Sequence, residues 1–447
     1  MRRVLYRTFR RVHNVGTRLR ARFTSVGFVL IAVLIGGAIF GIDIRKSLSY
    51  QLFAIAGGLL VVSIFATLRF RPCVAVRRTL PRHVMLGQTF HYQLEVENLG
   101  ARQRDGFSVR ERLADELPSY DAFVNAIEPG HEKRNAFDRY VGYPRWVWLL
   151  RQSRGAQFGQ TNLPPISPSS TVPAQMAMTP LRRGRLRFEA VEVSRTDPLG
   201  IARASRVLPC PAEVLVLPTL IPLQGLAFHG PRDVANSATM GAHSGEEEFF
   251  QLREFRQGDS LRRLHWPTLA RLGTPFVREM VASGHSTPVI YLETLAEPNT
   301  QRAQFEQAIS LAASLVKAAG SANGNGLVMG RAGAMGNAFH RYYDITALEA
   351  LALVEPVSER PNFEMLLPLI SNASALLAIF VDWDATSQDV FQRLKRAVPA
   401  CWALIVRPME TSVDEALGQH VFAVSPGTEA VVLERLVRDG AVVPSNG

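Results

Sequence analysis

Residues 245–280 read GEEEFFQLREFRQGDSLRRLHWPTLARLGTPFVREM, the most densely patterned stretch of the chain. Aromatic and charged side chains alternate here too closely for a simple buried helix or strand. Large aromatic rings favour burial, and charges buried beside them need partners. We therefore expect a fixed network of ion pairs and hydrogen bonds over Trp266. Its members, with His265 beside the ring, are Arg253, Glu254, Asp259, Arg262 and Arg271.

Two arginines of the same stretch, Arg256 and Arg263, are expected to point outward instead. An exposed charge contributes little to folding. These two side chains are therefore candidates for a partner surface.

The stretch also carries a family resemblance. Leu-Arg-Glu-aromatic comes first, followed by Gly258-Asp259, Arg262, His265-Trp266, Ala270-Arg271 and Val-Arg-Glu at 277–279. This order resembles the signature of bacterial membrane proteins that carry a domain of unknown function 58 (DUF58). The blocks Arg182-Arg183-Gly184 and Asp197-Pro198-Leu199-Gly200 resemble the upstream blocks of the same family, so the resemblance covers about the last two thirds of the chain.

The resemblance implies a cytoplasmic module that is anchored by a transmembrane hairpin. It also implies a von Willebrand factor A-like C-terminal fold and association with MoxR-type AAA+ ATPases. It implies no known reaction.

The positive charge of the chain is concentrated around its apolar segments. The net charge is +11, and residues 1–25 hold eight arginines and no acid, while residues 69–82 hold five arginines and no acid. A nucleic-acid surface would instead place a basic stripe on a folded domain. The charge pattern predicts a membrane orientation signal and a lipid partner, with no nucleic acid.

Two apolar runs, Val26–Ile42 and Leu52–Leu68, are each near the lower length limit for a membrane-spanning helix. The loop between them is short, and arginines lie on both outer sides. The positive-inside rule then places both termini in the cytoplasm, with two helices in the membrane. The resemblance implies that this membrane is the inner membrane of a bacterium. The Arg-rich arm before them is either an amphipathic helix on the lipid surface or a disordered tail.

These features predict a membrane-anchored α+β multidomain protein. The expected order is a basic arm (1–25), a transmembrane helical hairpin (26–70), a small antiparallel β-sandwich (71–220) with an insertion (119–179), the signature segment (221–285) and an α/β domain (286–447). In the sandwich, His91–Asn98 alternates and is expected to pair with Phe107–Arg112. Further strands are expected at Arg185–Val193, Ile201–Val207 and Glu213–Leu217.

The insertion contains the aromatic run RYVGYPRWVWLL at residues 139–150. Trp and Tyr are favoured at a lipid interface, which is one interpretation of this run. The interpretation that we prefer is a core strand of the sandwich extended by a loop.

After the signature, short apolar strands and amphipathic helices alternate. The strands are expected at 288–293, 327–330, 375–381, 401–406 and 421–424, and the helices at 304–319, 345–354, 363–370, 387–397 and 428–438. This alternation predicts a parallel sheet covered on both faces, a Rossmann-type arrangement.

The metal-binding motif of von Willebrand A-like domains is degenerate in this chain. The resemblance places it at Glu293-Thr294-Leu295-Ala296-Glu297, where the serine positions hold Leu295 and Glu297, and places a later acid at Asp382. Leu295 cannot coordinate a cation that needs hard oxygen ligands. We expect no metal and no cofactor. Asp382 and Asp384 are expected to solvate a strand end or to cap the helix near Ser387.

No catalytic motif of a known type occurs in the sequence, and the sequence contains no Walker-type loop. His265 among arginines is expected to be structural. The predicted function is a non-enzymatic scaffold or adaptor that is anchored in the membrane and contacts a protein partner. The alternative is a divalent-dependent hydrolase or nucleotide-binding enzyme that uses Asp382, Asp384 and His265.

Overall fold

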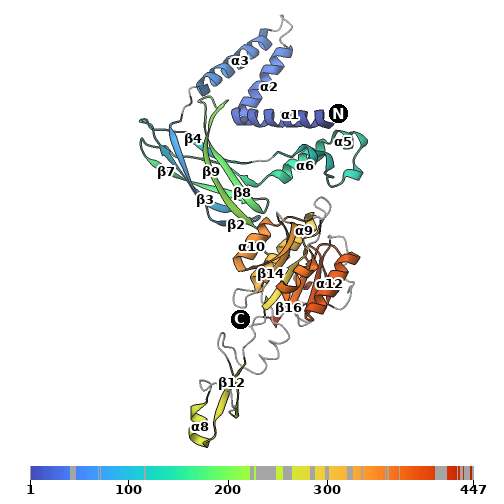
Figure 1. Ribbon diagram of the computed structural model, residues 1–447. Helices are drawn as coiled ribbons and strands as arrows, with labels where there is room; N and C mark the ends of the chain where they lie inside the picture. Colours follow the sequence, from blue (N-terminus) through green and yellow to red (C-terminus); the bar gives the residue numbers. More distant parts are fainter. Residues whose placement is uncertain are drawn as a thin grey trace. The chain divides into compact units, whose positions relative to one another are not determined.

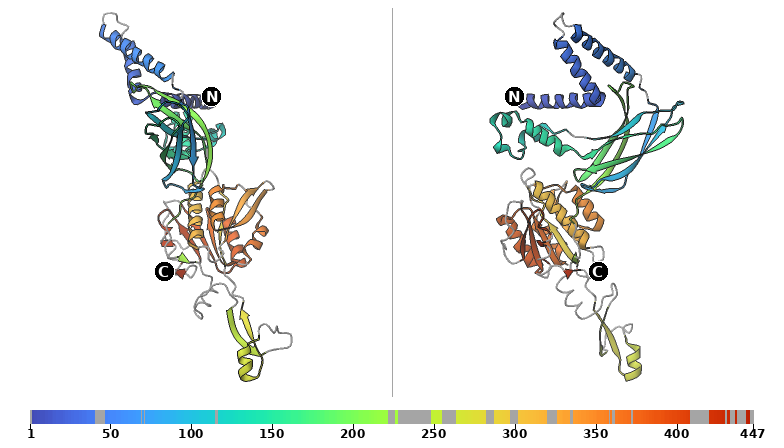
Figure 2. Two further views of the ribbon diagram at one scale, coloured as in Figure 1. Left: turned by 90° about the vertical axis from the view of Figure 1, so that its left-hand side faces the viewer. Right: turned by 180° about the vertical axis from the view of Figure 1, so that it is seen from behind.

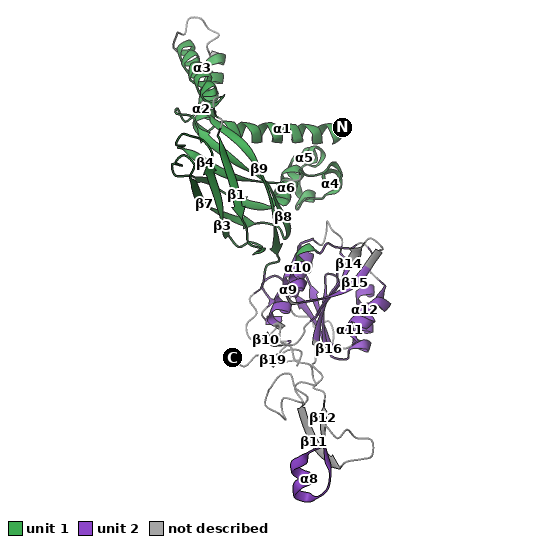
Figure 3. Cartoon of the chain, turned by 60° about the vertical axis from the view of Figure 1, so that its left-hand side comes forward, with its two compact units in different colours: residues 1–219, 351–353 green, residues 220–350, 354–447 purple. Residues whose placement is uncertain are grey.

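The chain forms two compact units in the computed structural model, and each is described by itself (Figures 1 and 3). Unit 1 comprises residues 1–219 with 351–353, and unit 2 comprises residues 220–350 with 354–447. The described residues are 2–40, 47–68, 70, 72–114, 117–221, 226–227, 248–254, 264–281, 287–296, 302–319, 326–333, 336–357, 359, 362–371, 373–407, 420–429, 431–432, 436 and 443–444.

Unit 1 begins with three helices, α1 (Arg2–Arg22), α2 (Ser25–Phe40) and α3 (Ser47–Leu68). Helices α2 and α3 pack side by side, and a Cβ atom added at Gly37 would lie only 3.2 Å from Cβ of Phe53. Residues Ser49–Leu68 of α3 are long and apolar enough to cross a membrane. Helix α2 is equally free of charge but shorter, with 16 residues.

Two β-sheets follow the helices and form a sandwich-like body (Figure 2). One sheet has the order β1-β3-β7-β5, with strands Val74–Thr79, Phe90–Asn98, Thr171–Pro180 and Ala156–Phe158. The other has the order β2-β9-β8-β4-β6, with strands His83–Met85, Arg203–Leu217, Gly184–Thr196, Phe107–Leu113 and Gln160–Asn162. Every neighbouring pair is antiparallel except β2 and β9. Alternate side chains of both sheets meet in one core, as the period of two in His91–Asn98 predicts.

The expected pairing of His91–Asn98 with Phe107–Arg112 is wrong. Strand β3 pairs with β1 and β7, whereas β4 pairs with β6 and β8 in the other sheet. Both strands bury one face, so their periodicity cannot reveal which sheet each one joins.

The two strands expected at Ile201–Val207 and Glu213–Leu217 are one long strand, β9. Pro209 and Pro211 do not interrupt it, because the pairing with β8 shifts register between Phe188 and Ala190. Proline is tolerated at such bulges.

A buried ion pair joins the two sheets. Nε and Nη2 of Arg78 lie 3.0 and 2.6 Å from the two carboxylate oxygens of Glu111, and Tyr92 donates its hydroxyl to Glu111 Oε1 at 2.8 Å. Burial, and then the neighbouring Glu111 carboxylate, raise the pKa of Tyr92 above its usual value. Arg78 is one of the five arginines that follow the apolar runs. Because it is buried and paired with Glu111, its charge is neutralised inside the sandwich and does not face a membrane.

The predicted insertion contains helices as well as strands of the sandwich. The helices are α4 (Tyr120–Asn125), the 3-10 turn η1 (His131–Lys133), α5 (Ala136–Val141) and α6 (Tyr143–Ser153). Strands β5 and β6 and all but the last residue of β7 also lie within residues 119–179, so the inserted part ends near residue 155.

The core strand expected at residues 139–150 is wrong, because this run is helical. Asn135 caps α5 by accepting a hydrogen bond from Asp138 N at 2.7 Å. Gly142, with φ +72°, ends α5 and precedes α6, and Pro144 occupies the first turn of α6. These helix punctuation signals outweigh the β-propensity of the aromatic residues.

Unit 2 is built on a six-stranded sheet of order β15-β14-β13-β16-β17-β18. Its strands in this order are Gly336–Tyr343, Gly326–Gly333, Thr287–Leu292, Ala373–Phe380, Cys401–Val406 and Val421–Val424. All neighbours are parallel except β14 and β15. The predicted parallel sheet is confirmed. The antiparallel edge strand β15 was not expected, since from Ala338 to its end only Phe339 is buried and its pattern is weak.

Helices cover this sheet, as the alternation of elements predicts. They are α9 (Arg302–Ala319), α10 (Asp344–Leu353), the 3-10 turn η4 (Phe363–Met365), α11 (Leu367–Ile370) and α12 (Ala385–Ala397). Val390, Phe391 and Leu394 of α12 share a core with Tyr291 and Phe380 of the central strands. The helix expected at 428–438 lies largely outside the described residues.

The signature segment lies on a separate two-stranded sheet of unit 2. Strand β11 (Glu248–Glu254) pairs antiparallel with β12 (Phe276–Val281), and α8 (Trp266–Leu272) lies between them in the chain. A second small pair consists of β10 (Leu226–Ala227) and β19 (Val443–Pro444).

Candidate functional site

The signature forms a hairpin whose two strands are fixed in register. Arg253 pairs with Val277 and Glu254 with Phe276. His265 donates its backbone N–H to the Phe276 carbonyl at 2.8 Å, and its ring Nδ1 lies 2.6 Å from Thr268 Oγ1. His265 therefore holds the start of α8 through its backbone and its ring.

The predicted network over Trp266 lies largely outside the described residues. Nothing is described for Asp259, Arg262, Arg256 and Arg263, nor for the side chains of Arg253 and Glu254. Trp266 is 64% exposed, so the expected burial of its ring is not observed. Arg271 is exposed in the last turn of α8.

The carboxyl ends of β13 and β16 form a second candidate site. The chain leaves β13 through α9 to reach β14 on one side, and it reaches β16 on the other side later. In open α/β sheets, ligands bind at such a switch in strand order. Residues Glu293, Thr294, Asp382 and Asp384 follow these two strands, so the structure brings the sequence-predicted positions to one edge of the sheet.

Glu293 is buried at this edge and bonded to its own loop. Tyr291 donates its hydroxyl to Glu293 Oε2 at 3.2 Å, and the Leu295 N–H donates to Oε1 at 3.2 Å. Both carboxylate oxygens therefore have partners from the protein. The Leu295 side chain adds no oxygen, and Glu297 lies outside the described residues.

The acids after β16 are engaged at the start of α12. Asp384 is the N-cap of this helix and accepts the Ser387 N–H at 2.7 Å, as expected. Asp382 accepts the Trp383 N–H at 2.7 Å. Within the described part of the chain, no three His, Cys, Asp or Glu side chains are close enough to hold a metal ion.

A third constellation joins the apolar helices to the sandwich, and the sequence did not reveal it. Asp197 accepts the Ala202 N–H at 2.8 Å with Oδ1 and the hydroxyl of Ser63, in α3, with Oδ2. Thr24, just before α2, donates its backbone N–H to the Ile201 carbonyl at 3.1 Å. The turn at Asp197–Gly200 was predicted from its Pro and Gly, and Gly200 has φ +70°. Its partners in the helices could not be predicted.

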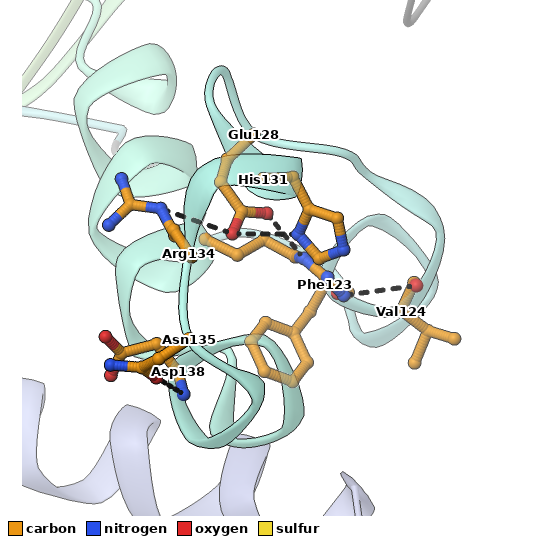
Figure 4. A network of polar contacts seen from close by, with 8 residues as sticks. Phe123, Val124, Glu128, His131, Arg134, Asn135 and Asp138 are labelled. Carbon is orange, nitrogen blue, oxygen red and sulfur yellow. Dashed lines mark hydrogen bonds and ion pairs between the residues drawn. The ribbon is translucent and has the colours of Figure 1, made fainter.

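The inserted helices hold a buried carboxylate (Figure 4). Glu128 accepts Arg145 Nε at 3.0 Å and lies 3.2 Å from His131 Nδ1. Burial alone would raise its pKa, but hydrogen bonds from the Glu128 backbone, Arg145 and His131 outweigh it and lower the pKa of Glu128. Arg145 also donates to the Phe123 carbonyl at 3.2 Å, which joins α6 to the end of α4. No motif in the sequence pointed to this cluster.

The family comparison agrees with the resemblance seen in the signature. Residues 251–341 match the family model described as "Protein of unknown function DUF58". The chain carries a DUF58 domain. The match begins in β11 and ends in β15. It is therefore narrower than the last two thirds of the chain, which the upstream sequence blocks had led us to expect. The matched residues therefore include most of the signature hairpin and, farther along the chain, β13, α9 and β14 of the sheet.

No curated protein matches the sequence. Parts of the chain have faint likenesses among solved structures. The NMR and crystal structures of the CARDB domain of PF1109 from Pyrococcus furiosus, the latter in complex with di-metal ions, have TM-scores of 0.16 and 0.18 at 14% and 13% identity. Each match covers 32% of this chain. It covers 94% of the chain in the NMR structure and 93% of the chain in the crystal structure. The ASH/PapD-like domain of human CEP192 has a TM-score of 0.16 at 11% identity, covering 32% of this chain and 87% of its own. Scores this low transfer no function to this chain.

Proposed function

We propose that this DUF58 protein is a non-enzymatic, membrane-anchored adaptor. A helical hairpin formed by α2 and α3 holds it in a bacterial inner membrane with both termini in the cytoplasm. Unit 2, a von Willebrand A-like domain, is presented to a protein partner, which by family resemblance is a MoxR-type AAA+ ATPase.

The membrane anchor is supported by the composition of the helices and by their attachment. Residues 49–68 are apolar over a length sufficient for a bilayer, and eight arginines precede α2. The bond from Ser63 to Asp197 and the backbone bond at Thr24 tie this hairpin to the sandwich. A hairpin fixed in this way would carry the folded part close to the membrane surface.

One observation carries the non-enzymatic role. At the switch point of the sheet, the carboxylate of Glu293 accepts hydrogen bonds from the Tyr291 hydroxyl and the Leu295 N–H. The side chain of Leu295 offers no oxygen ligand. Asp384 is used as a helix cap. A cation that needs several hard oxygen ligands would have to break these bonds first. The edge is better suited to contact another protein than to hold a reacting group.

The topology is tested with reporter fusions on the full chain. A reporter that is active only in the cytoplasm, fused after Gly447, gives signal, and a second fusion within residues 43–46 gives none. A reporter active only outside the cytoplasmic membrane serves as the matched control and shows the reverse pattern. Periplasmic signal at Gly447 refutes the proposed orientation.

The adaptor role is tested by purification from a detergent extract. Arg256→Ala and Arg263→Ala are expected to retain the thermal midpoint of the wild type and to lose the co-purifying partner. Added Mg²⁺ or a chelator leaves the midpoint unchanged, because only a ligand that binds the native state raises stability. A Mg²⁺-dependent stabilisation that is lost in Asp382→Ala would instead favour the hydrolase built on Asp382, Asp384 and His265.

A further inference from the structure

Helix α1 presents three distinct faces along its length, which follow from its period of 3.6 residues. Tyr6, Phe9 and His13 form an aromatic face. A second face is aliphatic, with Val4, Val12, Val15 and Leu19. A third face is basic, with Arg3, Arg7, Arg10, Arg11 and Arg18.

The aromatic face is covered by the inserted helices of unit 1. The ring of Phe9 lies 6.1 Å from that of Phe123 and 5.6 Å from that of Tyr143. The ring of Tyr6 lies 5.7 Å from that of Trp146, and its hydroxyl donates to the Pro118 carbonyl at 2.8 Å. This face has its partner within the protein.

The aliphatic face is uncovered in the described structure. Val4 and Val12 are each 65% exposed, Val15 is 54% exposed and Leu19 is 41% exposed. Thr8 lies on the same face. Its hydroxyl donates to the Val4 carbonyl at 3.0 Å, so the hydroxyl proton has a hydrogen-bond partner within the helix. A continuous apolar stripe of this kind needs an occupant.

The basic face borders the aliphatic one. Its arginines are exposed, and none forms an ion pair with a carboxylate among the described residues. An aliphatic stripe flanked by arginines is complementary to an anionic bilayer surface, where the stripe enters the acyl boundary and the arginines meet phosphates. An acidic protein would pair with the arginines but would also need an apolar surface beside its acids to cover the stripe.

The position of α1 in the chain favours the same occupant. Only Phe23 and Thr24 separate α1 from the apolar helix α2. The two helices point in different directions in all views of unit 1 (Figures 1 and 2). A helix that joins a membrane-spanning segment through a sharp bend is placed where the segment leaves the bilayer.

We propose that α1 lies on the anionic lipid surface through its aliphatic and basic faces, while its aromatic face holds residues 119–153 against the membrane. The proposal deepens the membrane-anchored function and rests on the hairpin of that function. It assigns the inserted helices to the membrane surface through α1 and not through direct insertion of their own aromatic rings.

The experiment uses the full chain, reconstituted in lipid nanodiscs, with an environment-sensitive fluorophore on a single new cysteine. Cys73→Ser and Cys210→Ala remove the accessible thiols, and Cys401 is buried. The labelled sites are Val15→Cys and Leu19→Cys on the aliphatic face and, as a matched control, the exposed Glu97→Cys on strand β3. Discs contain phosphatidylcholine alone or equal parts of phosphatidylcholine and phosphatidylglycerol.

With phosphatidylglycerol, the labels at residues 15 and 19 should shift to shorter wavelength and be quenched by lipids that carry a nitroxide, while the label at 97 should not. Replacing Arg7, Arg11 and Arg18 by Gln should reduce this signal, by about fivefold in surface occupancy for each arginine. Labels at 15 and 19 that behave like the label at 97 would overturn the proposal. Labels that shift to shorter wavelength but are not quenched by nitroxide lipids would overturn it as well, because they indicate a protein occupant.

Incorporation of the chain into the discs, measured by gel filtration, reports on the hairpin separately. A chain that enters the discs with water-exposed labels on α1 refutes the lipid-bound helix and leaves the anchor intact. A chain that does not enter the discs refutes the anchor and, with it, this proposal.

Discussion

Glu128 shows how a single buried carboxylate makes the inserted helices sensitive to pH. Its pKa is lowered in the folded state, so its contribution to stability is complete above the pKa of the unfolded chain and is lost as pH falls through the folded value. We therefore expect the amides of residues 120–153 to have lower protection factors in hydrogen exchange at pH 4 than at pH 7.

The variant Glu128→Gln should weaken these helices at neutral pH, because the carboxylate that pairs with Arg145 is lost. The expected cost is about 1–3 kcal/mol. Glu132→Gln in the same loop is exposed and is the matched control, with almost no change. If Glu128→Gln keeps the full acid sensitivity of the wild type, the sensitivity does not come from Glu128.

At the scale of elements, Gly142 determines that residues 136–153 form two helices. Its φ is +72°, and an added Cβ would lie 3.1 Å from Cζ of Phe123. Gly130 has a similar φ of +75°, but nothing lies within 4 Å of an added Cβ. An alanine at position 130 would carry only the backbone cost of a left-handed conformation, about 1–2 kcal/mol. An alanine at position 142 would carry the same cost and, in addition, the cost of the close contact with Phe123.

We expect Gly130→Ala to lower the unfolding free energy by the backbone cost alone, and Gly142→Ala to lower it further because Phe123 must move. Thermal midpoints and the emission of Trp146, which packs beside Phe123, report both effects. Equal losses in the two variants would show that Phe123 adapts without cost.

In unit 1, the Asp197 carboxylate is one of the groups that link the hairpin to the sandwich, beside the backbone bond at Thr24. In Asp197→Ala, the Ala202 N–H and the Ser63 hydroxyl lose their acceptor in a buried place. The expected loss is about 1–3 kcal/mol in the unfolding free energy of the full chain in detergent, measured by urea titration. Ser63→Ala removes one of the two bonds and should cost less, and Glu97→Ala is the exposed control. An unchanged midpoint in Asp197→Ala would show that the joint does not need the carboxylate.

Features that depend on neighbours in the chain could be predicted from the sequence. Period-two alternation identified β3 and β8, alternating apolar runs identified the central sheet strands, and Pro198 and Gly200 identified the turn before β9. Cap chemistry identified the role of Asp384. The motif spacing identified the DUF58 domain. In each case the physical cause lies within a few residues of the effect.

Which distant segments meet could be learned only from the folded chain. Only the fold places Arg78 beside Glu111, Asp197 beside Ser63, and the aromatic face of α1 on Trp146. It also assigned β3 and β4 to different sheets, although both carry the same alternation. Periodicity states that a face is buried but not what buries it, because the hydrophobic effect is not directional and the partner is chosen by the whole chain.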